Sequence, residues 1–223
     1  MMEFDKIFNI NRSMFFDRDS EGRMSFRGKY LAEFAPENYH QIVACSLSGL
    51  KKKDLTWLSE VFPSLVKVTI EKTSNITSLN GIGNYTSLNE LRIEDCPKLV
   101  DFSALESCQA LKNFNIEKIE HEIKVLQFVS RDVEELYLGS NVVDLPMIAE
   151  FGKLSALSLR GHESYAEELP DMPSVSKSFG LEGFKMLKSA KFLTNLSPEV
   201  RIRWWGPKPI SEVPAHLNAD LFK

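Results

Sequence analysis

The stretch LNELRIEDCPKL, from Leu88 to Leu99, decides the fold. Within it Leu91 and Ile93 are separated and flanked by charged residues. Side chains of a β-strand point to opposite faces with a period of two, so this alternation predicts a short strand with one buried and one exposed face. The polar run that follows, up to Cys96, is typical of a turn out of the strand.

Similar stretches recur on both sides of this one. The clear copies are LVKVTI (65–70), LKNFNI (111–116), VEELYLGSN (133–141) and LSALSLRG (154–161), and successive units start 23, 23, 22 and 21 residues apart. The same period extends outward to three weaker units: IVACSL (42–47), SKSFGL (176–181) and EVRIRW (199–204). A fixed period of this length indicates a repeat architecture.

Two positions of every unit are apolar. The fourth residues are Cys45, Val68, Leu91, Phe114, Leu136, Leu157, Phe179 and Ile202, and the sixth are Leu47, Ile70, Ile93, Ile116, Leu138, Leu159, Leu181 and Trp204. One repeat cannot bury its own apolar side, so repeats must stack and their strands form a parallel sheet. Apolar residues at three- and four-residue spacing, such as Leu58, Leu105, Leu126 and Ile148, predict short core-filling helices or helical turns in the return segments.

The unit from Leu88 to Cys96 resembles the leucine-rich-repeat pattern LxxLxLxxN/C, with Cys96 in the final place. This resemblance to the leucine-rich-repeat (LRR) family implies an α/β solenoid, or horseshoe, with a parallel concave β-sheet and short convex helices or turns. We expect about eight repeats of 21–23 residues over 42–205, the last two less regular. Residues 1–41 form an N-terminal cap with two short strands, or a small binding appendage, and 206–223 a C-terminal cap or tail.

Composition places few other demands on function. The chain has 223 residues, a net charge of −4 and 43% hydrophobic residues, which is an ordinary globular balance without an excess of basic residues. The N-terminus lacks the pattern of a secretory signal, and no apolar run reaches the length of a membrane span. With three cysteines and no CxxC pair, we expect a cytoplasmic protein with reduced thiols, no contact with membranes, and no preference for nucleic acid.

No catalytic motif stands out. The four histidines are scattered without metal-ligand spacing, and phosphate-binding glycine loops and the GxSxG elbow are absent from the sequence. Cys45 falls at an inward strand position and Cys96 at the turn, so both are interpreted as structural. We therefore expect no enzymatic activity, no cofactor and no metal.

The third, fifth and seventh residues of each unit are expected on the exposed, concave face, where the LRR resemblance places partner binding. Candidate partner-binding residues are Lys67, Glu71, Glu90, Arg92, Glu94, Asn115, Glu117, Glu135, Tyr137, Arg160, Arg201, Arg203 and Trp205. Among them Glu71, Glu94 and Glu117 are predicted to form an acidic column, which either favours a basic partner or is an ordinary solvated face. A basic and aromatic group is expected at the C-terminal end of the array.

These features predict a protein-interaction module that is a monomer when alone. One version of this hypothesis is a bacterial immunity protein that neutralises a toxin, such as a basic nuclease. The alternatives are a scaffold, an adaptor or a regulatory subunit of an enzyme, and an enzyme whose site lies in the unexplained N-terminal segment. Incomplete caps would expose sheet edges and permit dimers.

Overall fold

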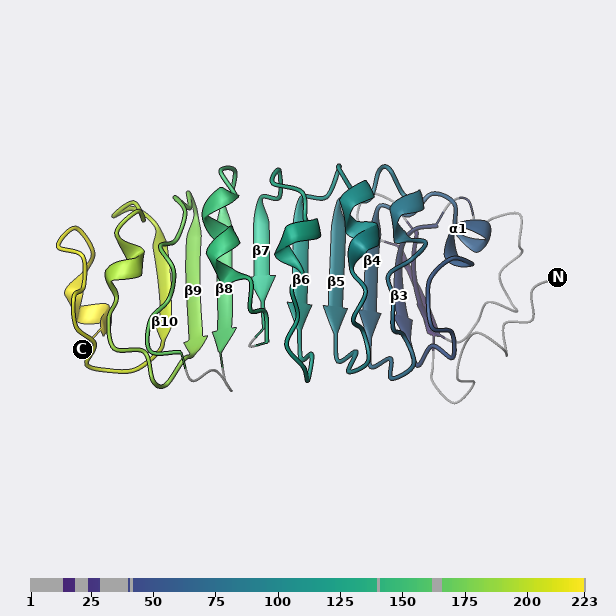
Figure 1. The fold of residues 1–223 in the computed structure, drawn as a ribbon. Coiled ribbons are helices and arrows are strands. Elements are labelled where there is room, and N and C mark those ends of the chain that lie inside the picture. The colour runs from purple at the N-terminus through teal and green to yellow at the C-terminus, as the bar shows by residue number, and fades with distance from the viewer. Residues whose placement is uncertain are drawn as a thin grey trace. The chain divides into compact units, whose positions relative to one another are not determined.

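The structure is a computed structural model that describes residues 14–18, 24–28, 40, 42–139, 141–161 and 166–222. The chain forms two compact units, residues 1–111 (unit 1) and 112–223 (unit 2), and each is described by itself. In both, short strands follow one another in sequence order (Figure 1).

Unit 1 contains five strands and three short helical segments. The strands are β1 (Met14–Arg18), β2 (Met24–Gly28), β3 (Ile42–Ser48), β4 (Lys67–Glu71) and β5 (Glu90–Glu94), and the helical segments are α1 (Leu58–Val61), η4 (Ile82–Asn84) and η5 (Ser103–Ser107). β1 and β2 pair antiparallel where the sequence predicted two short strands. The pairs β2–β3, β3–β4 and β4–β5 are parallel. The turn expected between β1 and β2, and most of the proposed N-terminal cap, lie outside the described residues.

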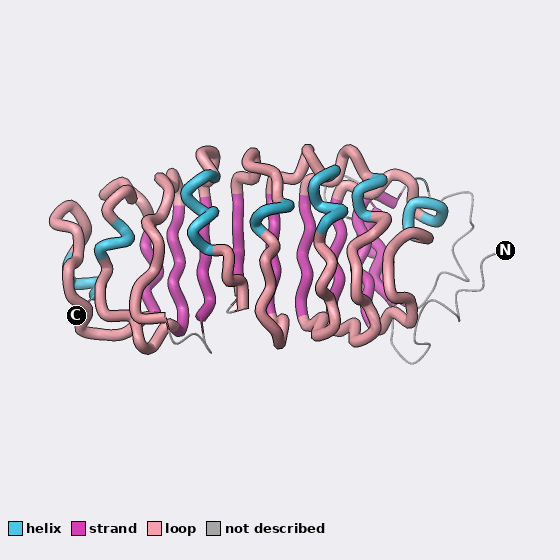
Figure 2. The backbone as a smooth tube through the Cα atoms, in the orientation of Figure 1, coloured by secondary structure: helices cyan, strands magenta, loops and turns pink. Residues whose placement is uncertain are grey.

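Unit 2 contains five strands in a parallel arrangement. They are β6 (Asn113–Glu117), β7 (Glu135–Leu138), β8 (Ala156–Gly161), β9 (Ser178–Gly183) and β10 (Arg201–Trp205), each paired with the next. The 3₁₀ segments η6 (Leu126–Phe128), η7 (Leu145–Glu150), η8 (Lys191–Leu193) and η9 (Ala219–Phe222) connect or follow the strands. Figure 2 shows the helical segments of each unit in a layer separate from its strands.

The two-residue alternation predicted from the sequence is confirmed by burial. Of the sixteen apolar residues at the fourth and sixth positions, all are buried except Ile202, which is half-buried on the last strand. The chain thus has a parallel-sheet, repeat-like fold. Leu58, Leu105, Leu126 and Ile148 are buried as expected, and the segments that contain them are short helical elements: α1 is a four-residue α-helix and η5, η6 and η7 are 3₁₀ turns. The described part of the segment between β8 and β9 has no helical element.

The turns that leave β3, β4, β5 and β6 share a strained backbone shape. The eighth residue of four successive sequence repeats has a positive φ: 63° at Gly49, 50° at Lys72, 56° at Asp95 and 54° at Lys118. Three of these four are not glycine, so the conformation is imposed by the stacking of the turns. In unit 1 that stacking is visible in the amide of Lys72, which donates to the carbonyl of Glu94 at 3.0 Å.

In some repeats the ninth residue places a polar group against backbone carbonyls. Cys96 is buried, and its thiol lies 3.5 Å from the carbonyl oxygen of Glu94 and 3.9 Å from that of Ile70. In unit 2, Asn141 occupies the equivalent place and donates to the carbonyl of Ile119. A buried backbone acceptor without a partner is costly, which explains why a hydrogen-bonding residue recurs there.

The C-terminal segment covers the apolar end of unit 2. Trp204, on the core side of β10, packs against Phe192 at 6.4 Å between ring centroids and edge-on against Phe222 at 4.8 Å. Phe222 is buried, and the imidazole Nε2 of His216 lies 2.7 Å from the carbonyl oxygen of Leu196. The segment after β10 therefore closes the core instead of leaving it in contact with water.

Candidate functional site

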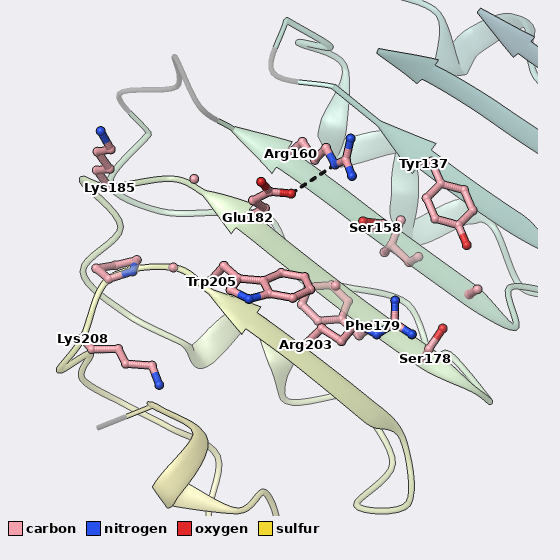
Figure 3. A pocket seen from close by; sticks show the side chains of 16 residues that line it. Tyr137, Ser158, Arg160, Ser178, Phe179, Glu182, Lys185, Arg203, Trp205 and Lys208 are labelled. Atoms are coloured by element: carbon pink, nitrogen blue, oxygen red, sulfur yellow. Dashed lines mark ion pairs between the residues drawn. The ribbon is translucent and has the colours of Figure 1, made fainter. Parts of the chain in front are cut away.

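The exposed face of unit 2 carries a hollow of about 770 Å³ over β7, β8, β9 and β10 (Figure 3). Its volume falls within the range that is usual for small-molecule pockets. The strands place most of the side chains that form it, because successive residues alternate between this face and the core, and the turns after β9 and β10 add the rest.

The floor of the hollow consists of four small residues on two adjacent strands. Ala156 on β8 is in register with Ser178 on β9, and Ser158 is in register with Gly180. A Cβ atom added at Gly180 would lie 3.1 Å from Oγ of Ser158, so even a small side chain there would begin to fill the floor. The absence of bulky groups at these four positions is what makes the surface concave.

Larger side chains stand on the two flanking strands. Tyr137 on β7 is in register with Ser158, and Arg203 on β10 is in register with Gly180, so the two lie on opposite sides of the floor (Figure 3). Trp205, two residues beyond Arg203, is 60% exposed, and Tyr137 is 37% exposed. Tryptophan and tyrosine are among the residues that most often dominate the binding energy at protein interfaces.

The charges around the hollow are unbalanced. Arg160 forms an ion pair with Glu182, with Nε to Oε2 at 3.2 Å, and a second with Glu117. Three other cations are exposed: Arg203, Lys185 after β9 and Lys208 after β10. In the part of the chain that the structure describes, none of the three has a carboxylate within ion-pair distance. The C-terminal ends of β9 and β10 are therefore positively charged.

Glu117 departs from the expected exposed column. It belongs to unit 2, is buried, and accepts a hydrogen bond from Nη1 of Arg160. Its carboxylate is thus neutralised within the protein and is not offered to a partner. In unit 1, Glu71 is in register with Glu94 on adjacent strands, and Glu94 is half-buried and bonded to Arg92 at 2.6 Å.

The remaining candidate residues are distributed over both units. Lys67 pairs with Glu90 at 2.9 Å on the face of unit 1. Asn115 on β6 is half-buried beside Tyr137, and its Oδ1 has no hydrogen-bond partner among the described residues. Glu135 and Arg201 lie on the same face of unit 2 but do not line the hollow.

Sequence reasoning missed two kinds of residue in this site. Lys185 and Lys208 lie in turns after the strands, outside the positions assigned to the exposed face. The floor residues were not among the candidate residues, although their small size at the third and fifth positions of two consecutive repeats was a usable signal. Side-chain volume, in addition to charge, would have indicated the hollow.

The three cysteines of the sequence are buried in unit 1, away from the residues that line the hollow. Burial raises the pKa of the Cys96 thiol to about 12 and that of Cys108 to about 11, so neither is a thiolate at neutral pH. In the described ranges, no three His, Cys, Asp or Glu side chains gather as a metal site would require. Nor does any helix within those ranges have the length and apolar character needed to cross a membrane.

In comparisons with known proteins, no protein-family model matches the chain, and no curated protein matches it either.

Proposed function

We propose that the protein is a non-catalytic interaction module of the leucine-rich-repeat type that binds a partner protein on the exposed face of unit 2. The observation that carries this proposal is the hollow itself, a concave surface with the exposed aromatic rings of Tyr137 and Trp205 at its rim. An aromatic ring exposed beside an empty concavity gains apolar burial when a partner covers it.

The leucine-rich-repeat assignment rests on the recurring unit. Most repeats supply a strand with two buried apolar residues, several have a left-handed residue after the strand, and the clearest ones carry a hydrogen-bonding residue such as Cys96 or Asn141 behind it. This combination fits the concave parallel sheet and short convex turns of a horseshoe solenoid. Solenoids of this kind present a rigid row of strand side chains, which suits recognition of another protein.

A capture experiment tests the proposal. The intact chain is used to isolate binding proteins from the lysate of its own cells, beside a Tyr137→Ala, Trp205→Ala double variant. Val100→Ala serves as the control, because Val100 is an exposed apolar residue of unit 1 that takes no part in the hollow. Each partner found is then purified, and its affinity for the three proteins is measured by calorimetry.

We expect at least one partner whose affinity falls more than tenfold in the double variant and stays within twofold of wild type in Val100→Ala. Loss of two interfacial aromatic side chains commonly costs that much binding energy. Partners that bind all three proteins equally, or no partner at all, would overturn the proposal. Whether the partner's own activity stops on binding separates a neutralising protein from an adaptor.

A further inference from the structure

We infer that the hollow of unit 2 binds an extended, acidic segment of the partner protein that carries an aromatic side chain next to its carboxylates. This inference rests on the proposed function and specifies its ligand. It differs from the sequence-based expectation of a basic partner, which depended on an acidic column whose members are in part buried or paired.

The first step of the argument is charge. The lining of the hollow holds four cations (Arg160, Lys185, Arg203 and Lys208) and the carboxylate of Glu182, in a protein whose net charge is −4. Of these four cations, Arg160 alone forms ion pairs with carboxylates of the described residues. A carboxylate-bearing ligand would supply the missing counter-charge, whereas a basic ligand would meet repulsion at this site.

The second step is the chemistry of Arg203. Arg203 is in register with Gly180 on β9, and a glycine has no side chain that could occupy the space beside it. A guanidinium binds a carboxylate through two parallel hydrogen bonds, which fixes the direction of the ligand as well as its charge. Because Arg203 is exposed and has no acidic partner in the described chain, its donors are available for such a ligand.

The third step is the ring of Trp205. This residue is the exposed member of the three tryptophans, since Trp57 and Trp204 are buried. It lies on the same strand and the same face as Arg203, two residues further on (Figure 3). A ligand residue next to the one held by Arg203 can therefore reach the indole, and an aromatic side chain would pack there most favourably.

The fourth step is width. Tyr137 and Arg203 are separated by the two floor strands, so their backbones stand about 14 Å apart at the usual strand spacing of about 4.8 Å. The wall side chains occupy part of that width. What remains accommodates one extended chain, but it is narrow for an α-helix, which is about 10–12 Å across with its side chains.

The test selects ligands without assuming their sequence. A random twelve-residue peptide library displayed on phage is selected on the intact chain, and in parallel on an Arg203→Glu variant and an Arg201→Glu variant. Arg201 is the matched control, because it is an exposed arginine on the same strand and face but does not line the hollow. Enriched peptides are synthesised, and binding is followed by calorimetry and by the tryptophan emission of Trp205.

We expect the wild-type chain and Arg201→Glu to enrich the same peptides, with Asp or Glu beside an aromatic residue. Binding should shift the tryptophan emission to shorter wavelength. The Arg203→Glu variant should bind these peptides at least tenfold more weakly than the wild-type chain. Arg201→Glu should change the affinity less than threefold, since its charge is further from the ligand. The peptides should also displace the cellular partner from the wild-type chain.

Several results would overturn the inference. These are enrichment of basic or uncharged peptides, equal effects of the two arginine variants, no enrichment, or tighter binding by a single-stranded oligonucleotide than by any peptide. If a cellular partner depends on Tyr137 and Trp205 while acidic peptides do not bind, the proposed function stands and only the ligand assignment fails. If acidic peptides bind but no cellular protein does, the proposed function is the part that fails.

Discussion

The guanidinium of Arg160, on β8, extends across the neighbouring strand β7 to the buried carboxylate of Glu117, on β6. The residue between them is Gly139, where an added Cβ would lie 3.1 Å from the Cα of Glu117. With no side chain at that point, the arginine can cover β7 and also contact Glu182 on its other side. The two ion pairs of Arg160 thus link β6, β8 and β9, and Arg160 lines one end of the hollow.

Removing this arginine should destabilise unit 2. In Arg160→Met the carboxylate of Glu117 stays buried without its partner, and we expect a loss of about 2 kcal/mol in the free energy of unfolding. The double variant Arg160→Met, Glu117→Gln should lose less than the sum of the single changes. The Lys67–Glu90 pair is the control, because both side chains are well exposed and their coupling should be below about 0.5 kcal/mol. Equal couplings in urea unfolding would contradict this account.

Gly81 is a position where a methyl group should not be tolerated. Its φ is 102°, and an added Cβ would lie 2.4 Å from the carbonyl carbon and oxygen of Leu55. We expect Gly81→Ala to lower the free energy of unfolding by more than about 2 kcal/mol. The control is Gly152→Ala, since no atom lies within 4 Å of its added Cβ, and it should stay within about 0.5 kcal/mol of wild type. Denaturant midpoints that do not separate the two variants would show that the Leu55 contact is unimportant.

The left-handed turn residues predict an unusual response to substitution. Lys72 is exposed and has a φ of 50°, so its side chain contributes little while its backbone is strained. Lys72→Gly should stabilise the protein by up to about 1 kcal/mol, and Lys72→Val should destabilise it by at least as much. At Lys98, an exposed lysine without a positive φ, the change to glycine should instead be neutral or unfavourable. Thermal unfolding of the three variants distinguishes these signs.

The buried thiols should make the fold sensitive to alkali. The unfolded chain releases thiol protons above about pH 8.5, whereas burial holds the pKa of Cys108 at about 11 in the folded state. Because the folded pKa is raised, the stabilising contribution is complete below the unfolded value and is lost as the pH rises toward 11. We expect the stability of Cys108→Ala to fall less between pH 8 and 10.5 than that of wild type. Parallel pH profiles in urea unfolding would refute the thiol linkage.

The period of the core was predictable because it is local. The fourth and sixth residues of each unit alternate with polar neighbours, and burial alone explains their positions. The return segments were harder, since apolar spacing of three or four residues suits a 3₁₀ turn as well as an α-helix. The pattern could therefore place Leu105 and Leu126 in the core without deciding the type of helix around them.

The site depended on information that the sequence pattern does not carry. Glu117 and Arg160 are 43 residues apart, and their pairing requires the register of three strands and a glycine directly after the middle one. From the sequence, Glu117 was indistinguishable from Glu71 and Glu94 and was expected to be exposed. Lys208 reaches the hollow only because the chain after β10 turns back toward it.

The four-residue floor of the hollow has a consequence for how binding specificity can change. Ala156, Ser158, Ser178 and Gly180 lie on the face of the sheet that carries the hollow, while the buried side chains of Leu157, Phe179 and their neighbours pack the sheet into the core. Replacing the floor residues alters the depth and shape of the recognition surface without removing any of the packing beneath it. Descendants of this chain, natural or designed, could exchange one binding target for another while the scaffold that carries the surface stays as it is.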